Sequence, residues 1–212
     1  MDLTALSKKP LLWGIAAVLL LAAGLGAWRG YSGYRKTSLQ QAVAPQLKAA
    51  DARLREALGA SLEPDPAQAE QAAAQLDATA KDIEARRATL RALDAAPDPA
   101  RVESADEALD SVAAIVRQQA AVLRAGLAFT QAREALEAHM RGARARRGDW
   151  VSEAIELKHK MERAYFDYKF ALDGLAARLG DVPDRDLAAQ VRERIDAALK
   201  HASAARAAAR RL

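Results

Sequence analysis

Residues 99–141 read PARVESADEALDSVAAIVRQQAAVLRAGLAFTQAREALEAHMR and form the longest uninterrupted helical pattern of this 212-residue chain. Apolar side chains recur every seven residues along it, in two parallel columns. One column holds Leu109, Val116, Leu123 and Thr130, and the other holds Ile115, Val122, Phe129 and Leu136. Because an apolar face of this width contacts more than one neighbouring helix, we predict that 99–141 is the central helix of a bundle.

Turn signals on either side divide the chain into further helices. The segments 63–66 (EPDP) and 96–99 (APDP) each supply an aspartate that can cap a helix and a proline suited to its first turn. Glycines and Asp149 mark a break at 142–149, and 180–183 (GDVP) marks another. The predicted bundle helices span about 39–59, 66–94, 99–141, 150–179 and 184–210.

The composition is that of a helical protein. Alanine is abundant, aromatic residues are 5% of the chain, and alternating strand patterns are absent. Short connections favour antiparallel neighbours. We therefore predict an all-α fold, in which an N-terminal transmembrane helix precedes an antiparallel up-and-down bundle of four to five long helices. In such a bundle the turns at 61–66 and 142–149 and the C-terminus share the end far from the membrane.

Residues 10–28 are the predicted membrane anchor. They carry no charged residue, and about 19 helical residues rise roughly 28 Å, close to the thickness of a bilayer core. The side chains expected to contact lipid are Leu11, Trp13, Ile15, Val18, Leu19, Leu20, Leu21, Leu25 and Trp28. We interpret 1–9 as a short tail, 10–28 as a signal anchor, 29–38 as a membrane-exit linker and 39–212 as the bundle domain.

Two alternatives remain open for this anchor. The same residues resemble a secretory signal peptide, with small residues near 22–26 as a cleavage site. Orientation is also open, because the basic residues that flank the span favour a cytoplasmic body by count, whereas a short N-terminal tail with Lys8 and Lys9 favours a body outside. We predict a single-pass protein of the bacterial inner membrane, with its C-terminal domain in the periplasm and a cytoplasmic orientation as the alternative.

Arginines gather in two segments that this topology brings to the membrane-distal end. They are Arg141, Arg144, Arg146 and Arg147, and, later in the chain, Arg206, Arg210 and Arg211. Guanidinium groups bind carboxylates and phosphates, so this basic tip is a candidate docking surface for an unidentified protein or an anionic envelope partner. The alternative is that the arginines only complement helix C-termini and are solvated. The net charge of +4 is too small for a dedicated nucleic-acid-binding protein.

Tyr165, Phe166, Tyr168 and Phe170 concentrate the aromatic residues of helix 150–179. The helix also carries an apolar stripe that we expect to be buried, comprising Val151, Ile155, Met161, Tyr165, Tyr168, Leu172, Leu175 and Leu179. Phe166 and Phe170 lie on the flank of this stripe. The aromatic group is therefore interpreted as core or a homo-oligomer face, with a ligand pocket as the alternative.

No catalytic, metal or cofactor signature is predicted. Glu156 and His159 have the Glu-x-x-His spacing of carboxylate-bridged metal bundles, but the pair faces away from the predicted stripe, and neither other histidine repeats the motif. The chain has no cysteine. We expect a non-enzymatic, membrane-anchored scaffold or adaptor that docks a partner through its basic tip. The alternatives are a small-molecule-binding or sensor bundle and a cytoplasm-facing tethered adaptor.

Overall fold

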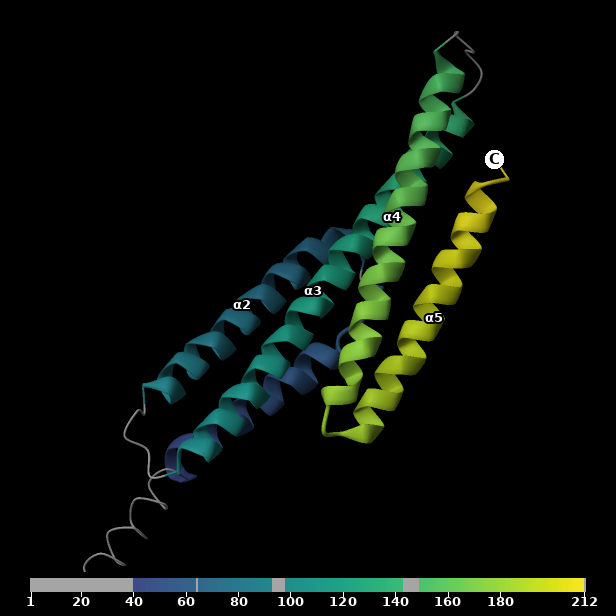
Figure 1. The fold of residues 1–212 in the computed structure, drawn as a ribbon. Coiled ribbons are helices and arrows are strands. Elements are labelled where there is room, and N and C mark those ends of the chain that lie inside the picture. The colour runs from purple at the N-terminus through teal and green to yellow at the C-terminus, as the bar shows by residue number, and fades with distance from the viewer. Residues whose placement is uncertain (1–39, 64, 93–97, 143–148, 212) are drawn as a thin grey trace, which may run out of the picture.

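The computed structural model describes residues 40–63, 65–92, 98–142 and 149–211, and within them every regular element is a helix (Figure 1). A first helical segment occupies residues 40–59. It is followed by α2 (Pro66–Arg91), α3 (Pro99–Arg141), α4 (Trp150–Arg178), the short 3-10 helix η1 (Leu179–Asp181) and α5 (Arg185–Ala209). The all-helical prediction is confirmed, and the boundaries lie within a few residues of those predicted.

Three aspartates begin helices as capping residues. The Asp65 carboxylate accepts from the backbone N–H of Ala67 at 2.9 Å, and Asp184 accepts from Leu187 at 3.0 Å. Asp98 accepts from the N–H of Arg101 at 3.3 Å. These bonds satisfy N–H groups that have no partner inside the helix. The predicted cap at Asp149 is wrong in this respect, because its side chain makes no capping hydrogen bond and its backbone is already helical.

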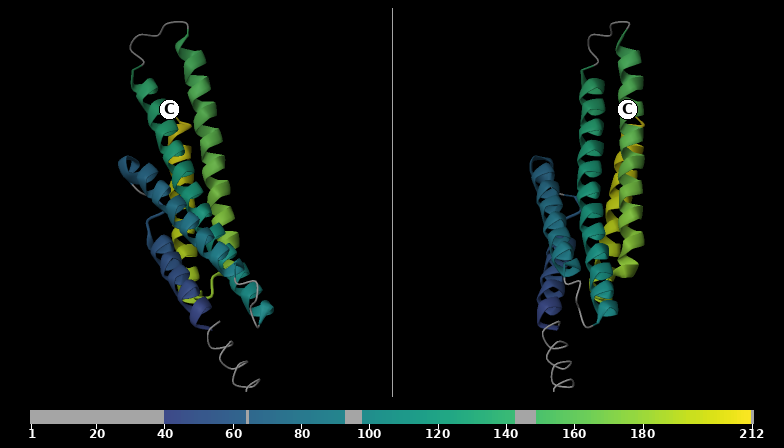
Figure 2. Two further views of the ribbon diagram at one scale, coloured as in Figure 1. Left: turned by 90° about the vertical axis from the view of Figure 1, so that its left-hand side faces the viewer. Right: turned by 60° about the vertical axis from the view of Figure 1, so that its left-hand side comes forward.

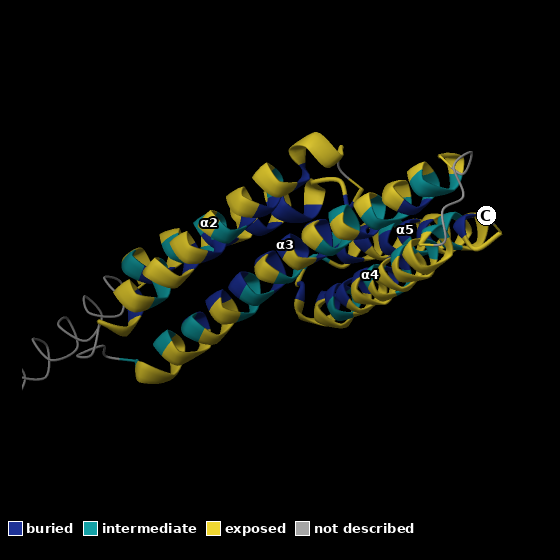
Figure 3. Ribbon diagram, turned by 90° about the horizontal axis from the view of Figure 1, so that it is seen from above, coloured by how far each residue is buried: buried dark blue, intermediate teal, exposed yellow. Residues whose placement is uncertain are grey.

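The two columns of α3 face two separate cores. Leu109, Val116 and Leu123 pack with α2 and the segment 40–59, whereas the column from Ile115 to Leu136 packs with α4 and α5. The prediction that α3 is central is therefore confirmed, and Figure 3 shows buried residues along both of its flanks. The body is thus two three-helix units that share one long helix, with the end of segment 40–59 entering the second core through Leu54 and Leu58.

The turn after segment 40–59 lies beside α3 near Phe129, before the end of that helix, which corrects its predicted place at the membrane-distal end (Figure 2). Leu62 belongs to the same core as Phe129, and the Gln119 amide donates to the carbonyl of Ala57 at 2.5 Å. The reason is length. Helix α2 has 26 residues and α3 has 43, so α2, whose last turn lies near the start of α3, covers only part of that longer antiparallel helix.

The first turns of α4 extend beyond the end of α5, and this leaves part of the predicted stripe uncovered. Val151 and Ile155 are 58% and 51% exposed, so the prediction that they are buried is wrong. Helix α5 ends at Ala209, near Glu162 of α4, as the bonds from Arg206 and Arg210 to that residue show. From Met161 onward the stripe is buried as predicted.

The predicted membrane anchor at 10–28 lies outside the described residues. Among the residues that are described, α3 alone is long and apolar enough, by composition, to cross a membrane. This is weak evidence for a span, because α3 packs against α2 on one side and α4 on the other, as the central helix of a core does.

Candidate functional site

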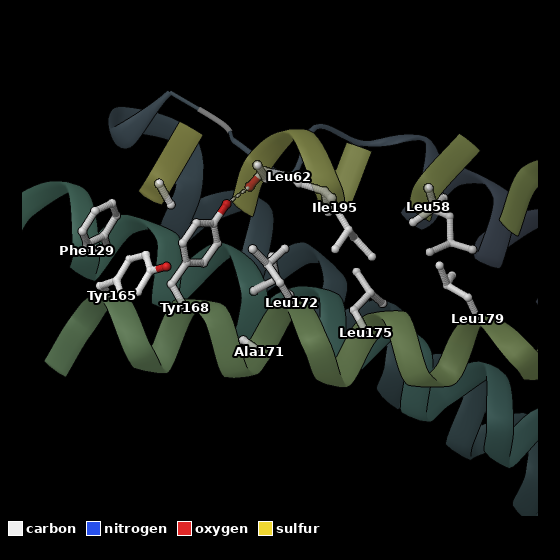
Figure 4. Close-up of a cluster of buried hydrophobic side chains, with 14 of the residues drawn as sticks. Leu58, Leu62, Phe129, Tyr165, Tyr168, Ala171, Leu172, Leu175, Leu179 and Ile195 are labelled. Atoms are coloured by element: carbon white, nitrogen blue, oxygen red, sulfur yellow. Dashed lines mark hydrogen bonds between the residues drawn. The ribbon is translucent and has the colours of Figure 1, made fainter. Parts of the chain in front are cut away.

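The aromatic segment of α4 divides into a buried pair and an exposed pair. Tyr165 and Tyr168 are 6% and 3% exposed and pack around Phe129 of α3 (Figure 4). The Phe129 ring lies edge-on to Tyr165 at 5.8 Å and stacks on Tyr168 at 6.3 Å. Phe166 and Phe170 point outward and are 54% and 80% exposed. The buried pair is therefore core, whereas Phe170 is open to solvent and Phe166 is partly covered by Arg206 of α5.

Tyr168 connects three parts of the fold. Its hydroxyl donates to the carbonyl of Leu62 at 3.5 Å, a long hydrogen bond that reaches the turn after segment 40–59. Its ring lies against Gly126 of α3, where a Cβ atom would stand 3.1 Å from the Tyr168 Cε2 atom. Burial, and then the negative charge of Glu63, raise the pKa of the Tyr168 hydroxyl, so it stays neutral at physiological pH.

A cavity of about 240 Å³ opens beside Tyr168, between the turn, α3 and α5. Phe129, Leu62 and Ala202 supply apolar walls. Polar groups also line it: the carboxylate of Glu63, the imidazole of His201 and the guanidinium of Arg133. Glu63 and His201 approach each other to 3.3 Å, and the buried Arg133 Nε makes no hydrogen bond among the described residues but lies 3.5 Å from Glu137 Oε1. The predicted pocket near the aromatic segment thus has a physical counterpart at Tyr168, and Tyr165 is not among its lining residues.

A second polar group, the Glu162 cluster, joins α4 to α5. Both oxygens of Glu162 are engaged: Arg206 Nε donates to Oε2 at 2.9 Å, and Arg210 Nε donates to Oε1 at 2.5 Å. The Arg206 guanidinium also lies 4.4 Å from the centre of the Tyr165 ring and 4.9 Å from that of Phe166. Arg206, together with Arg210, lowers the pKa of Glu162 from 4.5 to about 2.

The four described arginines of the predicted basic tip lie in different surroundings. Arg206 and Arg210 bind Glu162 within the bundle, and the C-terminus of α5 stops short of the end of α3 and α4 (Figure 1). Arg141 is exposed at the end of α3, and its Nε donates to the carbonyl of Glu137 at 3.3 Å. Arg211 is exposed. Arg144, Arg146 and Arg147 lie outside the described residues.

The described end of the α3–α4 hairpin is organised by His139. Its ring stacks on Trp150 at 5.1 Å between centroids, and its Nε2 atom lies 3.0 Å from the Trp150 carbonyl oxygen. The Nδ1 atom of His139 is 3.7 Å from Glu153. These contacts fix the first turn of α4 against the last turn of α3, so the overhang of both helices beyond α5 is a defined structure.

The exposed apolar residues of α4 form a row along one side of the helix, which we call the α4 row. Val151, Ile155, Phe166 and Phe170 are the large apolar side chains that remain more than half exposed in the described residues. Their spacing places them on one helical face. The sequence pattern placed Phe166 and Phe170 on the flank of the buried stripe, in agreement with their exposure. It assigned Val151 and Ile155 to the buried side, which does not agree with theirs.

The described residues contain no cluster of three or more metal-ligating side chains. Glu156 and His159, which have a metal-bundle spacing, are both exposed on α4. Comparisons of the chain with protein-family models, with curated proteins and with solved structures each found no match. The functional argument therefore depends on the chemistry of the surfaces described above.

Proposed function

We propose that this chain is a membrane-tethered, non-enzymatic helical scaffold or adaptor of the bacterial cell envelope. Residues 10–28 are its anchor in this proposal, and the bundle domain stands on the periplasmic side. The α4 row binds a partner helix that presents an apolar face. The single observation that carries the proposal is the exposure of two phenylalanines, a valine and an isoleucine along one helix.

Burial energetics support this choice of surface. Fully burying a phenylalanine, valine or isoleucine side chain contributes roughly 1.5–3 kcal/mol of favourable free energy. Four such side chains exposed to water therefore favour association with a partner that covers them. Aromatic anchors are also enriched among the residues that dominate binding energy. The basic tip is a weaker docking surface, because Arg206 and Arg210 are already bound to Glu162.

The test is position-specific photo-cross-linking in cells that express the full-length chain. A photo-reactive amino acid at Phe170 is expected to give a defined adduct, whereas the same group at exposed Asp167, on another side of α4, gives none. The adduct from a probe at Ile155 should disappear when Phe166 and Phe170 are both serine. Equal adducts at Asp167 and Phe170 would contradict binding through the row. Deletion of residues 10–28 should release the chain from the membrane fraction.

A second function, binding of a small molecule, is favoured by the cavity beside Tyr168. Its volume of about 240 Å³ lies just below the range of roughly 300–1,000 Å³ that is usual for ligand pockets. A carboxylate from Glu63 and a guanidinium from Arg133 both line it, which suits a small zwitterion with an apolar body.

Thermal melting of the full-length chain with a panel of amino acids and betaines tests this second function. A ligand that binds only the native state raises the melting temperature. Arg133→Gln should abolish the effect of an active compound. A panel that leaves the melting temperature unchanged removes the ligand-binding candidate and leaves the scaffold proposal standing.

A further inference from the structure

The cavity beside Tyr168 is closed on one side by the end of the first helical segment and its turn, which together make up segment 40–63. Leu62 and Glu63 supply this wall, and most of the remaining lining comes from α3, α4 and α5. The cavity therefore exists as a concave site only while the end of the segment is docked on those helices.

The docking of these wall residues depends on an apolar contact and two long side-chain hydrogen bonds. Leu62 is buried in the core formed with α4 and α5. Its carbonyl accepts from the Tyr168 hydroxyl at 3.5 Å, and the Glu63 carboxylate lies 3.3 Å from Nδ1 of His201 at the surface. Polar contacts of this length and exposure contribute little to stability. A further bridge to the other helices would therefore shift the balance between the docked and the undocked segment.

We propose that a small zwitterion bound in this cavity fastens segment 40–63 to α3, so that ligand occupancy sets how firmly the segment is docked. The inference rests on the second proposed function, ligand binding beside Tyr168, and adds its regulatory consequence. An ammonium group at Glu63 and a carboxylate at Arg133 place one charged end of the ligand on the segment and the other on α3.

Such a ligand favours the docked segment, because it loses part of its site when the segment leaves. Undocking removes Glu63 and Leu62 but leaves Arg133 on α3. Arg133 Nε lies 3.5 Å from Glu137 Oε1, and a guanidinium has five N–H donors, so others remain for a ligand. A ligand shifts an equilibrium between two states by the difference in its affinity for them. The coupling is reciprocal, since a segment that docks more firmly also binds the ligand more tightly.

Segment 40–63 follows the predicted linker 29–38 and anchor 10–28 in the chain, so its docking sets the reach of the tether. A segment released from the bundle adds tens of ångströms to the tether, at about 1.5 Å per residue if it stays helical. A ligand in the cavity therefore keeps the body of the tethered protein close to the bilayer, and an empty cavity permits a longer reach.

Hydrogen exchange of the full-length chain in mild detergent tests this coupling, with leucine and glycine betaine as the probes. The Arg194→Met variant is used, because loss of the donor to the Gly59 and Ala60 carbonyls makes local opening the main route of exchange at residues 54–63. A probe that binds only the docked state, at ten times its dissociation constant, slows these amides about tenfold. Residues 151–155 of α4, which do not line the cavity, should exchange at an unchanged rate.

The slowest core amides, around Ile83 and Leu123, separate this inference from ligand binding itself. Any ligand of the native state slows these amides, because they exchange by global unfolding. Slowing there without slowing at residues 54–63 means that the probe stays bound when the segment opens. That result overturns the inference and leaves the ligand-binding function standing. If neither probe raises the melting temperature, the zwitterion site and the inference are both overturned.

Arg133→Gln in the same background tests the bridging contact on α3. It should abolish the effect of the probe on exchange at residues 54–63. The matched control is Arg101→Gln, an exposed position near the start of the same helix, which should leave the effect unchanged. Slowing that persists in Arg133→Gln would show that the ligand does not bridge Glu63 and Arg133.

Discussion

Glu162 of α4 and Arg206 of α5 lie side by side across the hairpin, with Arg206 Nε donating to Glu162 Oε2 at 2.9 Å. The side chains of both are mostly covered, at 17% and 20% exposed. Arg210 completes the arrangement from the next turn of α5. This carboxylate is therefore the main polar connection between the last turns of α5 and the body of the bundle.

Glu162→Gln should destabilise the fold by about 1–2 kcal/mol at pH 7, because it removes two charge-assisted hydrogen-bonded pairs. The pKa of Glu162 falls from 4.5 to about 2 on folding. A lowered folded-state pKa gives stability that is fully present above about pH 4.5 and is lost as the pH falls through 2. Urea unfolding of both proteins from pH 7 to pH 2 should show their difference shrinking below pH 4.5. A difference that stays constant would indicate lost packing rather than lost charge.

Gly174→Ala tests the contact between Gly174 of α4 and Gln118 of α3. A Cβ atom at Gly174 would stand 2.6 Å from Gln118 Nε2, which donates to the Ala171 carbonyl at 2.8 Å. The alanine gains up to about 1 kcal/mol of helix propensity but displaces this hydrogen bond, worth about 1 kcal/mol, so the net change should be small. In a Gln118→Ala background the same substitution should stabilise by about 0.5–1 kcal/mol. Simple additivity in the double-mutant cycle would show that the two positions do not interact.

Arg194→Met should loosen the segment 40–59 from α5. The Arg194 guanidinium donates to the carbonyls of Gly59 at 3.2 Å and Ala60 at 3.0 Å, and also to that of Leu58. Losing these bonds at a helix C-terminus should remove about 1.5–3 kcal/mol and speed amide exchange around residues 54–63. Arg192→Met is the control, because Arg192 makes a single contact of 3.4 Å to the Ala176 carbonyl. Equal effects from both variants would argue against a specific role for Arg194.

The orientation of the bundle can be read from one cysteine at exposed Ala207 on α5. Labelling by an impermeant maleimide in cells with a permeable outer layer and an intact inner membrane is the expected result for a periplasmic domain. Protection until lysis would place the domain in the cytoplasm, as the count of flanking basic residues favours. Ala207 makes no side-chain hydrogen bond, whereas a cysteine at nearby Ser203 would remove the 2.9 Å hydrogen bond between the hydroxyls of Ser203 and Tyr165.

The central role of α3 could be predicted from sequence because a helix that buries two faces needs two apolar columns, and both were visible. The caps at Asp65 and Asp98 were equally readable, since each stands before a proline suited to a helix start. Local chemistry of this kind depends on neighbouring residues only.

Pairings between helices depend on register, which local patterns do not specify. The Glu162–Arg206 and Tyr165–Ser203 contacts both join residues equally distant from the turn near Asp184, so counting outward from that break would have found them. The same counting from Pro97 would have placed the turn at 61–65 beside residues 129–133 of α3, short of the end of that helix. Exposure of Val151 could not be found in this way, because it depends on where α5 ends.

Segment 40–59 begins at the same end of the body as α3, and the α3–α4 hairpin closes at the opposite end (Figure 2). The body therefore has two distinct ends, one that holds residue 40 and one that holds the α3–α4 hairpin. In the proposed tethered protein, a membrane anchor on the residue-40 side would hold this hairpin, and with it the exposed Val151 and Ile155 at the start of α4, at the end of the body farthest from the bilayer.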